Sequence, residues 1–156
     1  MTLLMTHSSL VQALTLIYFI KFDLILSYNG EFEPTKNSPN FKHDGVKMAS
    51  YENEPFIIGD YEHNQIEFLH LSHEIWYSIR PYRFQSRIFG YSAVSRPSKI
   101  FLFGGCCLND WSMVTLFEND EWNPIGSLKQ GRIHHLSIAY GTDVMIIGGI
   151  SNDNKP

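Results

Sequence analysis

A short apolar run that ends in glycine occurs three times in this chain at nearly equal intervals. The three copies are Phe56-Ile-Ile-Gly-Asp60, Phe101-Leu-Phe-Gly-Gly105 and Met145-Ile-Ile-Gly-Gly149. They are 45 and 44 residues apart, and a period of this size is typical of a propeller or a solenoid. The repeat constrains the fold more than any other feature, because each unit has to bury its apolar strands against the next unit.

Other features recur in the same register. Trp76 and Trp122 follow the first two apolar runs and lie 46 residues apart. Upstream of the runs, Arg87–Val94 aligns with Arg132–Ala139 at a shift of 45. A loop that carries arginine, a short strand, an apolar strand that ends in glycine, and a further strand with tryptophan therefore recur in order.

A partial copy of the unit lies near the start of the chain. Leu24–Pro34 matches Val114–Pro124 at a shift of 90, which is twice 45, and Phe32 takes the place of the tryptophan. The chain is thus expected to hold the second half of one unit, two whole units and the first half of another.

This order of features resembles the kelch repeat, in which each unit forms one four-stranded antiparallel blade of a β-propeller. The first unit departs from the pattern, because Gly59-Asp60 stands where the other units have a glycine pair. The resemblance implies an all-β fold, a partial and open kelch-type propeller. It divides the chain into an apolar N-terminal segment (1–23), a half blade (24–44), two blades (45–85 and 86–130) and a second half blade (131–156).

The residues support such a fold without the family name. Ile100–Phe103 and Val144–Ile147 are apolar on both faces, so these strands must lie between two covering layers. Glycine at their ends permits close backbone approach, and one tryptophan in each unit supplies a large surface for burial between blades. We assign this structural role to Gly59, Trp76, Gly104, Gly105, Trp122, Gly148 and Gly149. Outside the N-terminus no segment sustains a helical apolar period.

Composition argues against a nucleic-acid partner and against a secreted fold held together by disulfides. The net charge is −4 and the 12 lysines and arginines are dispersed, which argues against nucleic acid. The two cysteines, Cys106 and Cys107, are adjacent, so they cannot form the framework of a secreted disulfide fold. There is also no Asn-x-Ser/Thr glycosylation site. These two absences favour the cytosol.

The N-terminus is compatible with export. Leu10–Ile20 has the length of the apolar core of a signal peptide, and Lys21 and Asp23 interrupt it before it could span a bilayer. It lacks a preceding lysine or arginine and a small-x-small cleavage site. A weak signal sequence, a degenerate strand of a preceding blade and an unusual start remain three open interpretations, and no stable membrane span is expected.

No catalytic or metal site is expected. His70 and His73, and the pair His134-His135, lack the spacing of a helical zinc motif, and hydrogen bonding within the fold explains them more simply. The acidic turn Glu118–Glu121 is interpreted as a solvated hairpin. Nucleophile and phosphate-binding motifs are absent from the sequence. We therefore expect no enzyme activity, no cofactor and no metal.

A binding module remains, with a protein or peptide as ligand. The resemblance implies that the loops between strands 2 and 3, and between strand 4 and the next blade, open on the binding face. Aromatic and arginine side chains there are typical of interaction hot spots, although Tyr82 and Trp111 could equally pack on a neighbouring blade. The candidate binding residues are Tyr61, His63, Tyr82, Arg83, Arg87, Asn109, Asp110, Trp111 and Asn152.

An alternative function is that of a fragment of a secreted kelch-type propeller with carbohydrate-related or galactose-oxidase-like activity. In either case three blade equivalents are too few for a closed ring, since closed propellers have 4 to 8 blades. We therefore expect an open arc with exposed apolar blade faces at both ends and self-association through its open edges.

Overall fold

The computed structural model describes residues 19–21, 24–28, 32–34, 37–41, 46–59, 65–79, 89–105 and 111–151, with the backbone alone for the first three ranges. These residues form strands, turns and bends, and no helix occurs among them. The described part of the chain accordingly contains no helix with the length and apolarity to cross a membrane.

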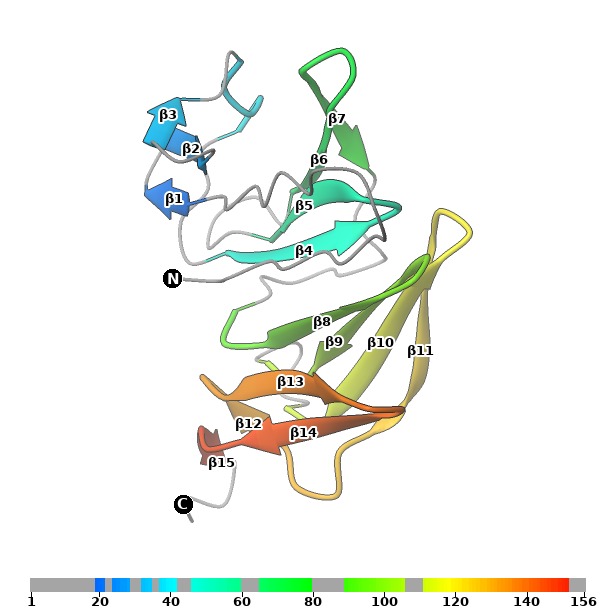
Figure 1. The fold of residues 1–156 in the computed structure, drawn as a ribbon. Helices are drawn as coiled ribbons and strands as arrows, with labels where there is room; N and C mark the ends of the chain where they lie inside the picture. The colour runs from blue at the N-terminus through cyan, green and yellow to red at the C-terminus, as the bar shows by residue number, and fades with distance from the viewer. Residues whose placement is uncertain are drawn as a thin grey trace.

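Two four-stranded antiparallel sheets form the centre of the molecule (Figure 1). The first, which we call the first blade, has the order β4-β5-β6-β7, with strands β4 (Lys47–Tyr51), β5 (Glu54–Ile58), β6 (Ile66–His70) and β7 (Ile75–Ile79). The second blade has the order β8-β9-β10-β11, with strands β8 (Ser92–Arg96), β9 (Lys99–Phe103), β10 (Met113–Glu118) and β11 (Glu121–Ser127).

Shorter sheets lie at the two ends. At the C-terminal end the half blade consists of β13 (Leu136–Tyr140) and β14 (Asp143–Ile147), and β12 (Arg132–Ile133) pairs with β15 (Ile150–Ser151). At the N-terminal end, β1 (Phe19–Lys21), β2 (Leu24–Tyr28) and β3 (Phe32–Pro34) form a three-stranded sheet of order β1-β2-β3. This sheet lies beside the first blade in Figure 1.

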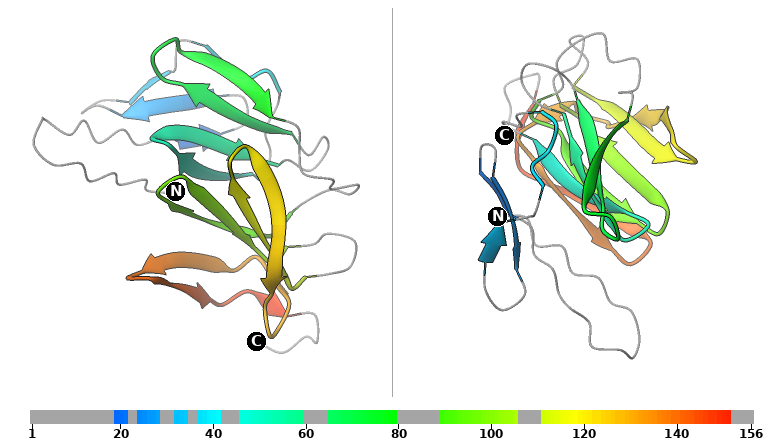
Figure 2. Two further views of the ribbon diagram at one scale, coloured as in Figure 1. Left: turned by 90° about the vertical axis from the view of Figure 1, so that its right-hand side faces the viewer. Right: turned by 90° about the horizontal axis from the view of Figure 1, so that it is seen from above.

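The blades stack through their first strands. β8 lies between β4 and β13, and the views of Figures 1 and 2 agree on this order. Residues at the same place in successive repeats are hydrogen-bonded: the Ser50 backbone N–H donates to Ser95 Oγ at 2.7 Å, and Ser137 Oγ donates to Ser92 Oγ at 2.7 Å. Both bonds join residues 45 apart. The prediction of an all-β, open propeller-like fold of four-stranded antiparallel sheets is confirmed.

The main core lies between the first and second blades. Phe56, Ile58 and Ala49 face it from the first blade, and Phe117 and Trp122 from the β10–β11 hairpin. The rings of Phe117 and Trp122 lie 4.8 Å apart, and Trp122 is 5% exposed. Each large apolar side chain buried in this way contributes roughly 1.5–3 kcal/mol to stability.

The opposite face of the first blade is also buried, around Ile57 and Trp76. Residues 37–41 lie against it: Trp76 Nε1 donates to the Asn37 carbonyl at 2.9 Å, and Asn40 Nδ2 donates to Glu67 Oε1 at 2.6 Å. Glu67 is fully buried, and its carboxylate also accepts the backbone N–H groups of Asn40 and Phe41. A preceding segment of the chain therefore covers the outer face of this blade. The exposed face expected at the N-terminal end belongs to Leu24–Leu26, whose side chains lie outside the described residues.

The half blade is exposed on its far face. Val144 and Ile146 pack toward the second blade, whereas Ile138, Met145 and Ile147 point away from it and are 44–46% exposed. Alternation along a strand sends successive side chains to opposite faces, so half of these apolar residues have no covering layer among the described residues. At this end the expected exposure is observed.

Glycines make room where the sheets converge. Gly104 has φ +59°, and a Cβ there would lie 2.5 Å from the Arg132 carbonyl oxygen. Gly149 has φ +86°, and a Cβ there would lie 2.6 Å from the Ile133 carbonyl oxygen. Only glycine suits a left-handed backbone at such short range.

Candidate binding groove

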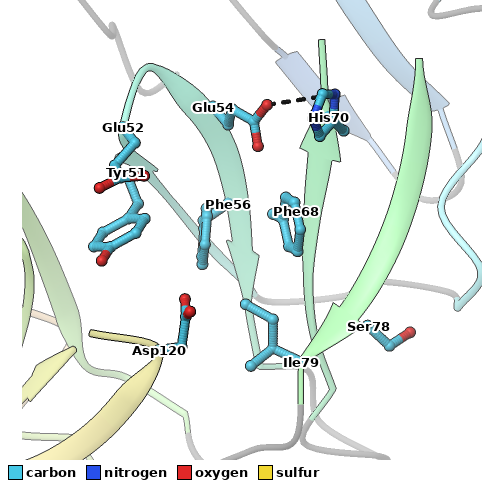
Figure 3. Close-up of a pocket in the computed structure, with 9 residues that line it drawn as sticks. All are labelled: Tyr51, Glu52, Glu54, Phe56, Phe68, His70, Ser78, Ile79 and Asp120. Carbon is cyan, nitrogen blue, oxygen red and sulfur yellow. Dashed lines mark ion pairs between the residues drawn. The ribbon is translucent and has the colours of Figure 1, made fainter. Parts of the chain in front are cut away.

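A groove of about 530 Å3 opens between the first blade and the tip of the β10–β11 hairpin. It runs along the first blade from the β4–β5 and β6–β7 turns to Ile79 at the end of β7, and Figure 3 shows the side chains around it. The lining residues are Tyr51, Glu52, Glu54, Phe56, Phe68, His70, Ser78, Ile79 and Asp120.

Aromatic rings form the floor of the groove. Phe56 and Phe68 are directly opposite each other on β5 and β6, and their rings stack with centroids 5.3 Å apart. The Tyr51 ring lies 5.6 Å from Phe56 and 5.0 Å from Phe117. Such cross-strand aromatic pairs stabilise a sheet face, and here they form a rigid apolar floor in which Phe56 is buried and Tyr51 and Phe68 are half-buried.

Carboxylates form the rim. Glu52 and Asp120 lie in the two-residue turns β4–β5 and β10–β11, where both central residues of each turn have positive φ (Glu52 51°, Asn53 68°, Asn119 52°, Asp120 61°). This is the backbone of tight hairpin turns that match the twist of the strands. The two turns bring an acidic side chain from each blade to the same groove (Figure 3).

His70 closes one end of the rim. Its Nδ1 lies 3.6 Å from Glu54 Oε1 and 3.0 Å from Ser72 Oγ, and its ring stacks on His73 with centroids 4.5 Å apart. These contacts orient the ring through neighbours on the same blade. No group of three histidine, cysteine or acidic side chains able to hold a metal ion occurs among the described residues.

The groove has a negative electrostatic character. No lysine or arginine is among the residues that line it. Burial and the neighbouring Glu52 carboxylate raise the pKa of Tyr51, so its phenol is protonated at neutral pH and can donate a hydrogen bond. The groove therefore offers aromatic faces, a phenol and three carboxylates, a combination suited to a cationic side chain.

The structure describes one of the nine loop residues predicted to bind a partner. Tyr61, His63, Tyr82, Arg83, Arg87, Asn109, Asp110 and Asn152 are outside the described residues, and so are Cys106 and Cys107. Trp111 is described and half-buried, and its carbonyl accepts the Arg132 N–H at 2.9 Å.

Sequence reasoning missed the groove because its residues lie in strands and turns that have ordinary structural explanations. The acidic turn Glu118–Glu121 was interpreted as a solvated hairpin, and His70 was weighed only as a metal ligand. The available signal was the second acidic hairpin turn, Glu52 to Glu54, at the same end of the preceding unit. Two acidic turns on the same side of adjacent repeats predict a shared acidic rim.

Comparison with known proteins supports the fold. No family model and no curated protein sequence matches the chain. Among solved structures, the chain is similar to the structure of YjhT, with a TM-score of 0.70 and 16% sequence identity. The similarity covers 85% of this chain and 47% of that chain, so this chain spans about half the length of the structure it matches. At this identity the likeness concerns the fold alone.

Proposed function

We propose that this chain is a non-catalytic protein-interaction module of propeller-like fold and kelch-like repeat, and that its groove binds a basic segment of a partner protein. The observation that carries the proposal is the lining of the groove, where aromatic rings form the floor and Glu52, Glu54 and Asp120 the rim. An arginine or lysine that enters would lie over an aromatic face and pair with a carboxylate.

The charge of the whole chain supports the same partner. With a net charge of −4 the molecule attracts basic segments over a distance, and the rim carboxylates add a local attraction at the groove. Rigid strands carry the aromatic floor, so little conformational entropy is lost in the protein when a segment binds.

Selection of a phage-displayed peptide library against the full chain tests the proposal. The selected peptides are expected to be enriched in arginine and lysine, and their affinity is expected to fall as salt concentration rises. Asp120→Asn should weaken binding of a selected peptide by about tenfold, which corresponds to about 1.4 kcal/mol. Asparagine tolerates the positive φ of this turn position, so the fold should be preserved.

Glu121→Gln is the matched control. Glu121 is exposed, follows Asp120 directly and does not line the groove. Equal losses of affinity in the two variants would indicate a general charge effect and would contradict binding in the groove. Selected peptides without an excess of arginine and lysine would contradict the basic partner.

A further inference from the structure

Two stacked histidine rings lie at one end of the candidate binding groove. His70 lines the groove from β6, and its ring stacks on that of His73 with centroids 4.5 Å apart. The β6–β7 turn holds both residues, because the backbone N–H groups of His73 and Glu74 donate to the His70 carbonyl at 3.2 and 2.8 Å. The proposed binding of a basic segment uses the carboxylates of the rim and leaves these rings without a role.

His70 faces the carboxylate of Glu54. The two residues are neighbours on the same face of β5 and β6, since each lies two positions from the directly paired Phe56 and Phe68. His70 Nδ1 lies 3.6 Å from Glu54 Oε1, and Figure 3 shows the carboxylate turned toward the ring. The Glu54 side chain is 24% exposed, so water screens its charge only in part and a charge on the ring acts on it strongly.

Ser72 provides a partner for the ring in both of its charge states. Its Oγ lies 3.0 Å from His70 Nδ1. In a neutral ring with the proton on Nε2, Nδ1 accepts the hydrogen of the Ser72 hydroxyl. In a protonated ring Nδ1 is a donor, and both Ser72 Oγ and Glu54 Oε1 are acceptors beside it. The ring therefore keeps its position when it gains a proton, and the charge of the rim is what changes.

The second blade has a permanent ion pair at the equivalent place. Strand pairing sets Glu118 of β10 beside Lys99 of β9 as it sets His70 beside Glu54, and Lys99 Nζ lies 2.9 Å from Glu118 Oε2. Lysine and glutamate both stay charged between about pH 5 and 8. Histidine is the side chain that changes charge in this range. The pair in the first blade is therefore the one whose charge depends on pH.

The surroundings of His70 contain no competing cation among the described residues. The charged and titratable groups near it are Glu54 on β5, His73 and Glu74 in the β6–β7 turn, Tyr77 on β7, and Glu52 and Asp120 in the β4–β5 and β10–β11 turns. Repulsion between the stacked rings opposes protonation of both histidines together. One proton on His70 is thus the main change of charge at this rim on mild acidification.

We infer that His70 makes the groove a pH-sensitive binding site, which holds a basic segment at neutral pH and releases it on mild acidification. The inference rests on the proposed function, because it concerns regulation of the same groove. With a neutral His70 the rim presents the three negative charges of Glu52, Glu54 and Asp120. A proton on His70 neutralises one of them and places a cation beside the incoming arginine or lysine, and both changes oppose binding.

Binding of rhodamine-labelled hexa-arginine amide to the full chain tests the inference. Fluorescence anisotropy gives its dissociation constant at about pH 7.5 and about pH 5.5, on either side of the histidine range, at constant ionic strength. The arginine side chains do not titrate there, so any dependence on pH arises in the protein. We expect the dissociation constant to be about fivefold larger at the lower pH, which is the upper end for an exposed charge pair.

Two histidine variants assign the effect. His70→Gln removes the titrating ring, and its dissociation constant should change by less than about 1.5-fold between the two pH values. Its retained affinity at the lower pH also shows that the fold persists there. His134→Asn is the matched control, because His134 is exposed, lies outside the groove and has a positive φ of 55° that asparagine tolerates. This variant should keep the full fivefold change.

The outcomes separate this inference from the proposed function. Hexa-arginine that does not bind at neutral pH, or that binds equally to Asp120→Asn, would overturn both. Binding in the groove with the same affinity at the two pH values would overturn the inference alone, and so would a pH dependence that survives in His70→Gln. A pH dependence reduced equally in His70→Gln and His134→Asn would assign it to the overall charge of the chain and would also overturn the role of His70.

Discussion

The contact between the first and second blades and the far face of the half blade use equivalent residues in opposite states. Phe56 and Ile58 are 3% and 0% exposed, whereas their repeat equivalents Met145 and Ile147 are 46% and 44% exposed. The strand pairing is the same, since β5 pairs with β4 as β14 pairs with β13. The apolar side chains of a repeat strand are therefore buried only where a neighbouring blade packs on them.

The two contacts are also held differently at their rims. Between the blades, the rings of Tyr51, Phe56 and Phe117 pack together. Between the second blade and the half blade, Arg96 takes the place of Tyr51 and bonds to backbone carbonyls of the β13–β14 turn. The contact between the blades (the closed contact) is packed with large aromatic rings, whereas the contact with the half blade combines the smaller apolar side chains Val144 and Ile146 with the polar bonds of Arg96. Mutations should therefore affect the stability of the two contacts with different magnitudes.

The largest effect is expected at the aromatic pair of the closed contact. Trp122→Ala should lower the free energy of unfolding by about 3–5 kcal/mol, because it leaves a cavity beside Phe117 in the main core. Denaturant titration measures the loss. Tyr140→Ala, at a residue that is 71% exposed on the half blade, is the control and should change stability by less than about 0.5 kcal/mol. Equal losses at the two positions would contradict the difference between the contacts.

Much of this architecture could be predicted from the sequence. The 45-residue period and the paired Trp76 and Trp122 indicated a repeat, the resemblance to kelch repeats implied four-stranded units, and the doubly apolar β9 indicated a strand covered on both faces. The cover on the outer face of the first blade could not be predicted, because it depends on residues 37–41, where the Asn37 carbonyl accepts from Trp76 Nε1 and Asn40 bonds to the buried Glu67. Such polar contacts join segments with no periodic pattern.

The groove could not be predicted from single repeats either. It combines Tyr51 and Glu54 of one unit with Asp120 of the next, so its composition appears only when the blades are stacked. The same is true of the apolar hollow of about 490 Å3 whose walls come from the second blade and the half blade. Sites between repeats depend on stacking, whereas residues such as Gly104 follow from the repeat itself.

Two equivalent glycines provide the next test of the comparison. At Gly104 a Cβ would lie 2.5 Å from the Arg132 carbonyl oxygen, whereas at Gly148 nothing lies within 4 Å. Both have positive φ, +59° and +67°. Gly104→Ala should lower the free energy of unfolding by about 2–5 kcal/mol, because left-handed strain and the clash act together. Gly148→Ala should lower it by about 1–2 kcal/mol, because only the strain acts there. Thermal unfolding of both variants gives the difference, and equal costs would mean that the convergence of backbones at Gly104 is not tight.

Acid should weaken the junction of the half blade. Burial and the nearby Arg132 lower the pKa of His135 from 6.5 to about 4. Between pH 6.5 and about 4 the unfolded chain binds a proton at His135 that the folded chain does not. The free energy of unfolding is therefore unaffected by His135 above pH 6.5 and decreases as pH falls toward 4. At about 1.4 kcal/mol for each pH unit, the loss reaches about 3 kcal/mol.

Denaturant titration at several pH values measures this loss, with His135→Asn and the exposed His73→Gln as variants. The pH dependence should shrink in His135→Asn and persist in His73→Gln. Gly90 stands at the equivalent position one repeat earlier, so the closed contact has no such histidine. Amides of β13 should accordingly exchange faster than those of β4 on acidification, and a uniform response across the sheets would count against His135 as the cause.

The smallest effect is expected at the polar bonds that hold the half blade. The Arg96 guanidinium donates to the Gly141 and Asp143 carbonyls, each at 2.7 Å. These bonds are exposed, so Arg96→Met should cost only about 1 kcal/mol, at the low end for bonds to a charged group. That cost should appear as a roughly fivefold faster hydrogen exchange of β13 and β14 amides, with β4 and β5 unchanged, because local opening of an outer element does not require the blades to separate.

Lys99→Met is the control, since Lys99 pairs with Glu118 of its own blade at 2.9 Å and its replacement should leave the half blade unaffected. Faster exchange in both blades of Arg96→Met would mean that the half blade and the closed contact unfold as one unit, and the two regions would then differ in burial but not in stability.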